Sequence, residues 1–435
     1  MGRSSGVSRP GVIGLALPAL GALAAEPLYL LVDTAVVGHL GAVQLGALGI
    51  AGSLLAQVSG QCNFLAYGTT GRAARRFGAG RRADAIGEGV QATWLALGLG
   101  LLILVVGQLL AGPACGLLAG NDHAVRSAAE GWLRIAVCGA PCILISLAGN
   151  GWMRGVQDTR RPLVFVAIAN GLSAVLCPLL VYVADLGLTG SAIANVCAQT
   201  VGAALFLRAL LAEGVSLRPH RATIWAQLVV ARDLVARTLG MQLCFLTAAA
   251  VAARMGTAQI AAHQIVLQLW NFLALVLDSF AIAAQALVGG ALGAGDSARA
   301  RSTARMVAFY GGGAGFVFAA LALAGWSVVP ELFSSSHAVV AQAHVAWPWF
   351  AAMQIPAGVV FALDGVLMGA GDVGYLRTLT ITAALGGFLP MTVLAYALHW
   401  GLGGVWAGLT LFILLRLVGM VWRTHGERWA LVGAN

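Results

Sequence analysis

The sequence has few charged residues and no lysine. Of its 435 residues, 9% are charged and 60% are hydrophobic, and all 25 basic residues are arginines. An average soluble protein carries about 25% charged residues. A soluble core could not bury this much apolar surface. The composition and the mean hydropathy of +0.88 therefore predict a polytopic membrane protein, with the lipid bilayer as its surroundings.

The acidic residues are too few to balance the arginines, which leaves a net charge of +9. A basic excess can indicate nucleic-acid binding, but these arginines collect in short segments between apolar runs. That distribution is typical of membrane topology rather than of a binding face. We therefore expect no nucleic-acid partner.

Motifs for metal binding and catalysis are also lacking. None of the seven cysteines forms a CxxC motif. Cys138 and Cys142 lie four residues apart, but no nearby histidine or carboxylate completes a metal site. The sequence contains no HExxH and no nucleophile motif. We expect no enzyme activity, no metal and no cofactor, and we interpret the cysteines as small buried hydrophobic residues.

Long apolar runs follow one another along the whole chain. A hydrocarbon core about 30 Å thick needs about 20 apolar residues per helix. On this basis the sequence predicts about twelve spans, at residues 12–37, 46–70, 90–112, 131–153, 162–184, 188–211, 236–253, 259–291, 304–329, 344–368, 376–398 and 402–422.

The arginines between the spans predict the orientation. Every second connection is rich in arginine, whereas the alternate connections hold almost none, with Arg126 and Arg254 as exceptions. By the positive-inside rule, the arginine-rich connections and both termini are expected to be cytoplasmic, in an inner or plasma membrane.

An internal repeat divides the chain. Residues 41–85 align with residues 256–300 without a gap at an offset of 215 residues, and a later block aligns at an offset of 214. Two colinear blocks indicate two six-span halves in the same orientation. We predict an N-lobe at 1–212, a cytoplasmic linker at 213–235 and a C-lobe at 236–435.

Acidic residues are rare inside the spans, and four are predicted there: Glu26, Asp33, Asp278 and Asp364. An ionised Asp at the centre of a membrane helix costs about 2.5–3.5 kcal/mol, so such residues usually serve as proton, cation or substrate sites. Protonation removes most of that cost, so Asp33 is suited to act as a proton switch. For Asp278 and Asp364 a structural hydrogen bond is the alternative, and for Glu26 a helix kink at Pro27.

The two halves differ in these charges. The first-half counterparts of Asp278 and Asp364 are the amides Asn63 and Asn150, whereas Asp33 aligns with an alanine in the second half. The halves are therefore predicted to share a scaffold and to differ in charge chemistry, as in an ion-coupled carrier with unequal lobes.

Residues 33–41, Asp-Thr-Ala-Val-Val-Gly-His-Leu-Gly, resemble the first-helix signature of MATE (multidrug and toxic compound extrusion) transporters, particularly of their DinF-like branch. Residues 155–159 (Gly-Val-Gln-Asp-Thr) and 363–365 (Leu-Asp-Gly) also match that branch, and the resemblance covers essentially the whole chain. It implies an all-α membrane protein with a V-shaped pair of six-helix lobes. It also implies antiport of cationic or amphipathic compounds, including drugs and xenobiotics, by alternating access and entry of H+ or Na+.

The resemblance also implies roles for individual residues. The first-helix acid of the family maps onto Asp33, its bending proline onto Pro18, and its C-lobe acids onto Asp278 and Asp364. The N-lobe polar pocket departs from the family pattern, because a serine and a cysteine replace the usual Asn and Asp of the fifth span and an asparagine replaces a sixth-span Thr. The expected pocket consists of Asn63, Asn170, Ser173, Cys177 and Asn195.

The absence of the family's fifth-span Asp affects which coupling ion is expected. Sodium prefers several oxygen ligands, whereas protonation needs one acid. We therefore favour H+ over Na+, with Asp33 rearranging its hydrogen bonds to Asn170, Ser173 and Asn195 on protonation, and with Glu26 sharing the role.

A lipid or lipid-linked precursor flippase of a related superfamily is the alternative. A flippase for anionic carriers would need arginines in its cavity, and only Arg134 and Arg416 are predicted inside spans, which argues against it. The expected substrates are therefore small organic cations or amphipathic compounds, and the protein is expected to be a monomer.

Overall fold

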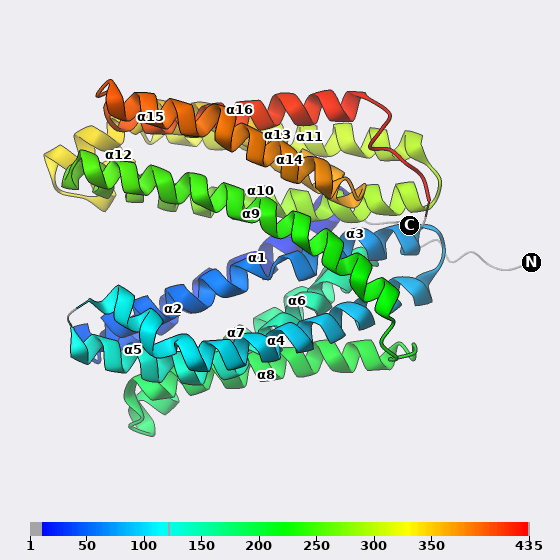
Figure 1. Ribbon diagram of the computed structural model, residues 1–435, viewed down its shortest axis with the longest axis horizontal. Coiled ribbons are helices and arrows are strands. Elements are labelled where there is room, and N and C mark those ends of the chain that lie inside the picture. The colour runs from blue at the N-terminus through cyan, green and yellow to red at the C-terminus, as the bar shows by residue number, and fades with distance from the viewer. Residues whose placement is uncertain (1–10, 121, 434–435) are drawn as a thin grey trace, which may run out of the picture. The chain divides into compact units, whose positions relative to one another are not determined.

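The computed structural model describes residues 11–120 and 122–433, and over these residues the chain forms helices and no strand. Figure 1 shows them, with these bounds: α1 (Val12–Gly38), α2 (Ala42–Gln61), α3 (Phe64–Gly78), α4 (Arg82–Ala119), α5 (His123–Ala136), α6 (Ala140–Gly155), α7 (Arg160–Pro178), α8 (Gly187–Ala212), α9 (Arg221–Met255), α10 (Thr257–Gly293), α11 (Ser297–Ala324), α12 (Val328–Phe333), α13 (His337–Gly369), α14 (Val373–Ala383), α15 (Leu389–Ala397) and α16 (Gly401–His425).

Twelve helical segments among the described residues are long and apolar enough to cross a membrane. Four of them combine shorter elements: α2 with α3, α5 with α6, α7 with the π-helix Leu179–Val183, and α14 with α15 through the π-helix Ala384–Phe388. Each of the twelve predicted spans overlaps one segment, so the predicted all-α membrane fold is confirmed. The ninth span was predicted to run to residue 329, but α11 ends at Ala324.

The internal repeat is visible in the backbone. Residues with positive φ angles, which L side chains rarely adopt, recur at the predicted offsets of 215 and 214 residues. The pairs, with φ in degrees, are Gly41 (130) and Gly256 (144), Gly80 (77) and Gly295 (79), Gln157 (64) and Gly371 (75), Asp185 (51) and His399 (56), and Gly187 (53) and Gly401 (65). Both halves therefore begin and end corresponding helices with the same turns.

By its contacts the chain divides into two compact units. The N-unit consists of residues 21–235, and the C-unit consists of residues 236–433 together with residues 11–20. The predicted lobe bounds stay a prediction, and the ends of those lobes, residues 1–10 and 434–435, lie outside the described residues.

A buried charge cluster holds the start of α9 against α3 and α4 in the N-unit. Glu88 on α4 has no exposed side-chain surface and forms ion pairs with Arg72 (2.9 Å) and Arg76 (2.6 Å). Gln227 on α9 donates a hydrogen bond to the same carboxylate at 2.8 Å. Because a buried carboxylate needs several donors, Glu88 fixes three helices together at this end of the unit.

Close helix packing holds the C-unit together. Helix α13 packs against α10, α11 and α16 (Figure 1). The backbones of α11 and α13 approach so closely that a Cβ atom on Gly311 would collide with the carbonyl oxygen of Gly358. Small residues at such contacts are typical of membrane bundles, where packing rather than the hydrophobic effect drives association.

We expect Gly311→Ala to lower the unfolding temperature of the purified protein, because overpacking costs about 1–3 kcal/mol. Gly313→Ala is the matched control on the same helix, since a Cβ there would have no atom within 4 Å. Thermal unfolding in detergent measures both. Equal melting temperatures for the two variants would contradict the close packing of α11 and α13.

Candidate functional site

Asp33 lies on α1, inside the N-unit, and is 2% exposed. Its Oδ1 accepts two hydrogen bonds, from the Cys177 thiol on α7 (3.1 Å) and from the Ser191 hydroxyl on α8 (2.8 Å). The Ser191 hydroxyl in turn accepts a hydrogen bond from the indole Nε1 of Trp132 on α5, at 3.2 Å. Four helices therefore meet at this carboxyl group through Trp132, Ser191, Cys177 and Asp33, which we call the Asp33 network.

The sequence predicted Cys177 beside Asp33 but missed Ser191 and Trp132. Ser191 lies four residues before the predicted pocket residue Asn195 and therefore on the same face of α8. That spacing was the one signal in the sequence that could have indicated Ser191 as a member of the site. The side chain that reaches Asp33 depends on how deeply α8 is inserted, which the sequence alone does not determine.

The other predicted pocket residues lie near the network without bonding to Asp33. Asn195 Nδ2 donates to the hydroxyl of Tyr29, one helical turn before Asp33, at 3.5 Å. Ser173 is buried, and its hydroxyl has no hydrogen-bond partner among the described residues. Asn170 is half-buried on α7. The expected bonds from Asn170, Ser173 and Asn195 to Asp33 are therefore replaced by bonds from Cys177 and Ser191.

Three further predicted residues of the N-lobe lie apart from the network. Glu26 is exposed on α1, and Asn63 is exposed in the break between α2 and α3. Neither makes a hydrogen bond with Asp33 in the part of the chain that the structure describes. Pro18 is half-buried, and α1 continues as one helix through it.

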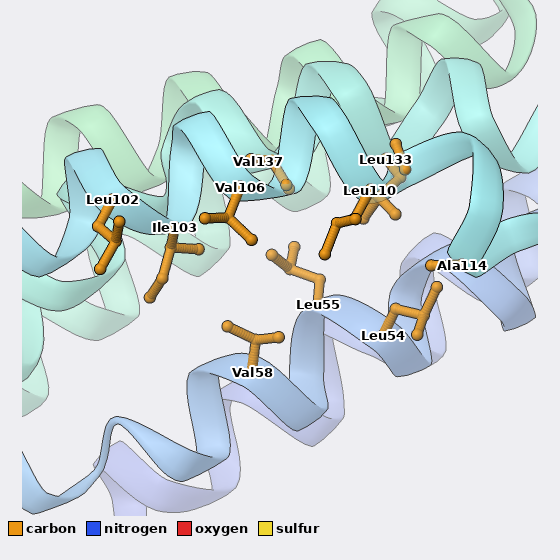
Figure 2. A pocket seen from close by; sticks show the side chains of 12 residues that line it. Leu54, Leu55, Val58, Leu102, Ile103, Val106, Leu110, Ala114, Leu133 and Val137 are labelled. Carbon is orange, nitrogen blue, oxygen red and sulfur yellow. The ribbon is translucent and has the colours of Figure 1, made fainter.

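An apolar groove lies between α2, α4 and α5 of the N-unit. Its volume is about 340 Å³, and Figure 2 shows leucine, isoleucine and valine side chains of these helices around it. Leu55 and Val58 lie on α2, and Val106 and Leu110 face them from α4. No polar side chain lines it, so it offers room for the apolar part of a ligand but no group that would orient a polar one.

Asp364 of the C-unit is held by two arginines. Arg237 Nη1 on α9 lies 3.0 Å from Asp364 Oδ1, and Arg416 Nη2 on α16 lies 2.6 Å from Asp364 Oδ2. All three side chains are largely buried, with side-chain exposures of 12%, 7% and 1% for Arg237, Asp364 and Arg416. We call these three residues the Arg–Asp–Arg cluster.

The cluster corrects the predicted distribution of arginines. Only Arg134 and Arg416 were predicted inside spans, and Arg237 was assigned to a cytoplasmic connection. It lies instead well inside α9, because that helix begins at Arg221. Arg134 forms an ion pair with Glu130 one turn away, at 2.8 Å and partly exposed. Asp278, the other predicted acid of this lobe, is half-buried on α10.

No group of three histidine, cysteine, aspartate or glutamate side chains among the described residues is arranged to hold a metal ion. The buried acids contact thiol, hydroxyl and guanidinium groups instead. These contacts suit proton transfer and charge pairing.

Twelve apolar helical segments in the described part of the chain, an internal six-span repeat and charged groups buried inside the spans define a polytopic membrane protein with the architecture of a carrier. The family model described as MatE matches residues 18–179 and 234–393. The chain belongs to this family, whose members are membrane transporters.

The chain is also similar to individual proteins along most of its length. The chain is 33% identical to the chloroplastic Protein DETOXIFICATION 44 of Arabidopsis thaliana, over 95% of this chain and 81% of that protein. It is 30% identical to the DNA damage-inducible protein F of Escherichia coli (strain K12), over 94% of this chain and 91% of that protein. The resemblance to the DinF-like branch is therefore confirmed. A solved structure of MATE in the bent conformation has the same fold, with a TM-score of 0.88, 21% identity and coverage of 95% of both chains.

Proposed function

We propose that this transporter is a proton-coupled antiporter that exports amphipathic organic compounds, drugs and xenobiotics among them, by alternating access. Asp33 is the proton acceptor. The observation that carries the proposal is the contrast between Asp33 and Asp364, two buried acids that were both predicted inside spans. Asp364 has two guanidinium partners, whereas Asp33 receives hydrogen bonds only from a thiol and a hydroxyl. A buried carboxylate without a cationic partner is costly, so a proton is its natural counter-charge.

The donors around Asp33 favour H+ over Na+. Sodium is a hard cation that binds several oxygen ligands, and one of the two groups bonded to Asp33 Oδ1 is the sulfur of Cys177. A proton needs one carboxylate oxygen. The exposed Glu26 on the same helix is a second proton acceptor in this proposal.

Protonation of Asp33 changes which hydrogen bonds the network can make. The ionised carboxylate accepts bonds from Ser191 and Cys177, whereas the protonated acid carries an O–H that must donate to a new acceptor. The carbonyl oxygen of the Asn195 side chain is buried and has no partner among the described residues. It is the acceptor that we assign to this state. Two arrangements of α1 against α7 and α8, each favoured by one protonation state, supply the free-energy difference that a switch requires.

The direction of export follows from the charge pattern. The arginine-rich connections and both termini are cytoplasmic in this proposal, and the protein acts as a monomer in an inner or plasma membrane. Protons enter the cytoplasm and the substrate leaves it.

Separately imposed gradients test the coupling. We expect a pH gradient across proteoliposomes to drive transport of an amphipathic fluorescent probe, and an imposed Na+ gradient at equal pH on both sides to drive none. Transport driven by Na+ alone would refute the assignment of H+ as the coupling ion.

Ser191→Ala is expected to raise the pH of half-maximal transport by about one unit, because a hydrogen bond to a charged group contributes about 1.5 kcal/mol. In the wild type the Ser191 hydroxyl stabilises the ionised form of Asp33. Without this donor the carboxyl group takes its proton at higher pH. Transport rate against external pH measures the shift. Ser173→Ala is the matched comparison on α7, since Ser173 does not bond to Asp33. A shift in Ser173→Ala but not in Ser191→Ala would show that the network is assigned to the wrong serine.

A further inference from the structure

The Arg–Asp–Arg cluster carries more positive than negative charge. Asp364 is the only acidic partner of Arg237 and Arg416 among the described residues. One positive charge therefore remains uncompensated among side chains that are nearly inaccessible to solvent. A buried charge that is left without a partner costs several kcal/mol. Charged groups inside membrane spans usually mark a substrate or ion pathway.

Each arginine of the cluster keeps an unused Nε–H donor, although both Nη atoms of Arg416 are engaged, by Met241 and by Asp364. Asp364 contacts Nη1 of Arg237 and Nη2 of Arg416. The Nε–H groups of both arginines are buried and have no partner among the described residues. An arginine binds a carboxylate or a phosphate best through two parallel N–H groups, and the Nε–Nη edge is one such fork. Both arginines thus have donors in place that no protein group uses.

Several other arginines of the protein bind their acids through Nε, whereas Arg82 and Arg301 do so through Nη2. Arg423 at the end of α16 binds Asp372 through Nε, at 2.7 Å, in a pair of one cation with one anion. Arg72 binds Glu88 through both Nε and Nη2. Arg301 also leaves a buried Nε unused, but its acid partner Glu427 is exposed. Arg237 and Arg416 differ because both side chains and their shared acid are largely buried.

We propose that the Arg–Asp–Arg cluster is an anion subsite, at which the carboxylate or phosphate group of an amphipathic substrate accepts hydrogen bonds from the unused Nε–H groups of Arg237 and Arg416. Asp364 orients the two guanidinium groups and prevents an uncompensated pair of cations when no substrate is present. The ring centroid of Phe412, on the same helix α16, lies 5.6 Å from the guanidinium carbon of Arg416. The inference rests on the proposed antiport and names its substrate class as organic anions, in place of the cations that the family resemblance implied.

Two probes with the same aromatic body and opposite charge test the subsite: 2-naphthoate and (2-naphthylmethyl)trimethylammonium. Binding to the purified transporter and transport into proteoliposomes are measured for both. We expect the wild-type protein to bind and transport naphthoate. Arg237→Gln and Arg416→Gln should each weaken naphthoate binding about tenfold or more, the loss expected for one charge-assisted hydrogen bond.

Two further variants separate a binding role from a structural one. Arg423→Gln removes an arginine from the balanced pair on the same helix α16 and should leave naphthoate binding unchanged. Arg237→Lys keeps the charge but loses the planar fork, so it should fold like the wild type and bind naphthoate with intermediate affinity. A melting curve for each variant accompanies the binding measurement.

A third probe distinguishes the source of the anionic group. Vesicles that contain fluorescent phosphatidylglycerol report whether an anionic lipid is translocated, and naphthoate reports on a free organic acid. Transport of either probe that depends on Arg237 supports the subsite and identifies the source.

Three results would overturn the subsite. In the first, the wild type neither binds naphthoate nor translocates phosphatidylglycerol. In the second, it transports the ammonium probe alone, and in the third, the arginine variants lose the binding of both naphthyl probes equally. Transport driven by Na+ alone would instead refute the proposed proton coupling and leave the anion subsite standing.

Discussion

Asp33→Asn is expected to reduce pH-driven efflux to the level of vesicles that contain no protein. The asparagine amide keeps the shape of the carboxyl group but takes up no proton at physiological pH. Asp33 is the only acid of the network, and the donors Cys177 and Ser191 both point at it. Without it the two arrangements of α1 no longer differ in protonation, and the pH gradient has nothing to act on. Efflux of a fluorescent substrate from proteoliposomes under an imposed pH gradient measures the loss.

The control for this prediction is Asp158→Asn. Asp158 forms a partly exposed ion pair with Arg161 three residues away, at 3.2 Å, and such pairs contribute about 0–1 kcal/mol. It should therefore transport like the wild type. Substrate counterflow without any pH gradient should survive in Asp33→Asn, because exchange of substrate for substrate needs no proton. Wild-type rates of pH-driven efflux in Asp33→Asn would refute the assigned proton acceptor.

Asp364→Asn is expected to destabilise the protein by about 3–5 kcal/mol, the typical effect of removing one partner from a buried ion pair. The variant leaves Arg237 and Arg416 close together, buried and without any negative charge between them. Urea or SDS titration of the purified protein, followed by tryptophan fluorescence, measures the loss. The double variant Asp364→Asn with Arg416→Met should regain part of it, since the remaining cluster carries one charge instead of two.

The matched variant is Asp372→Asn. Asp372 also pairs with an arginine of α16, but at side-chain exposures of 17% and 19% for the two partners. Water screens the charge that is left behind, so the loss should be clearly smaller. Equal losses for the two aspartate variants would mean that the Arg–Asp–Arg cluster is hydrated, and the argument from its unbalanced charge would fail.

The fold could be predicted from the sequence because its signals repeat. Each apolar run is long enough to cross a membrane, and the offset that aligns Gly41 with Gly256 also relates their positive φ angles. Local breaks were harder to predict. The turn at Cys62 and Asn63 divides one apolar run into α2 and α3, and no proline marks this break in the sequence.

The site was predicted only in part, for two physical reasons. Asp33 is conspicuous because a carboxylate is costly in an apolar helix, but its partner Ser191 belongs to a residue type that is common on membrane helices. Arg237 was missed because hydropathy placed the start of its span at residue 236, and an arginine at that edge was assigned to the connection. The helix begins 15 residues earlier, at residue 221, so the same arginine lies inside the bundle.

The unbalanced charge of the Arg–Asp–Arg cluster bears on the energetics of export. When a monovalent cation leaves in exchange for one proton, no net charge crosses the membrane, and the membrane potential does no work. When a monovalent anion leaves for one proton, two charges move in the direction that an inside-negative potential favours. At 100 mV that contributes about 4.6 kcal/mol per cycle, at about 2.3 kcal/mol for each charge. By selecting an anionic substrate, a single surplus guanidinium group inside the C-unit would thus make the exchange electrogenic, able to export against a gradient even when the pH is equal on both sides.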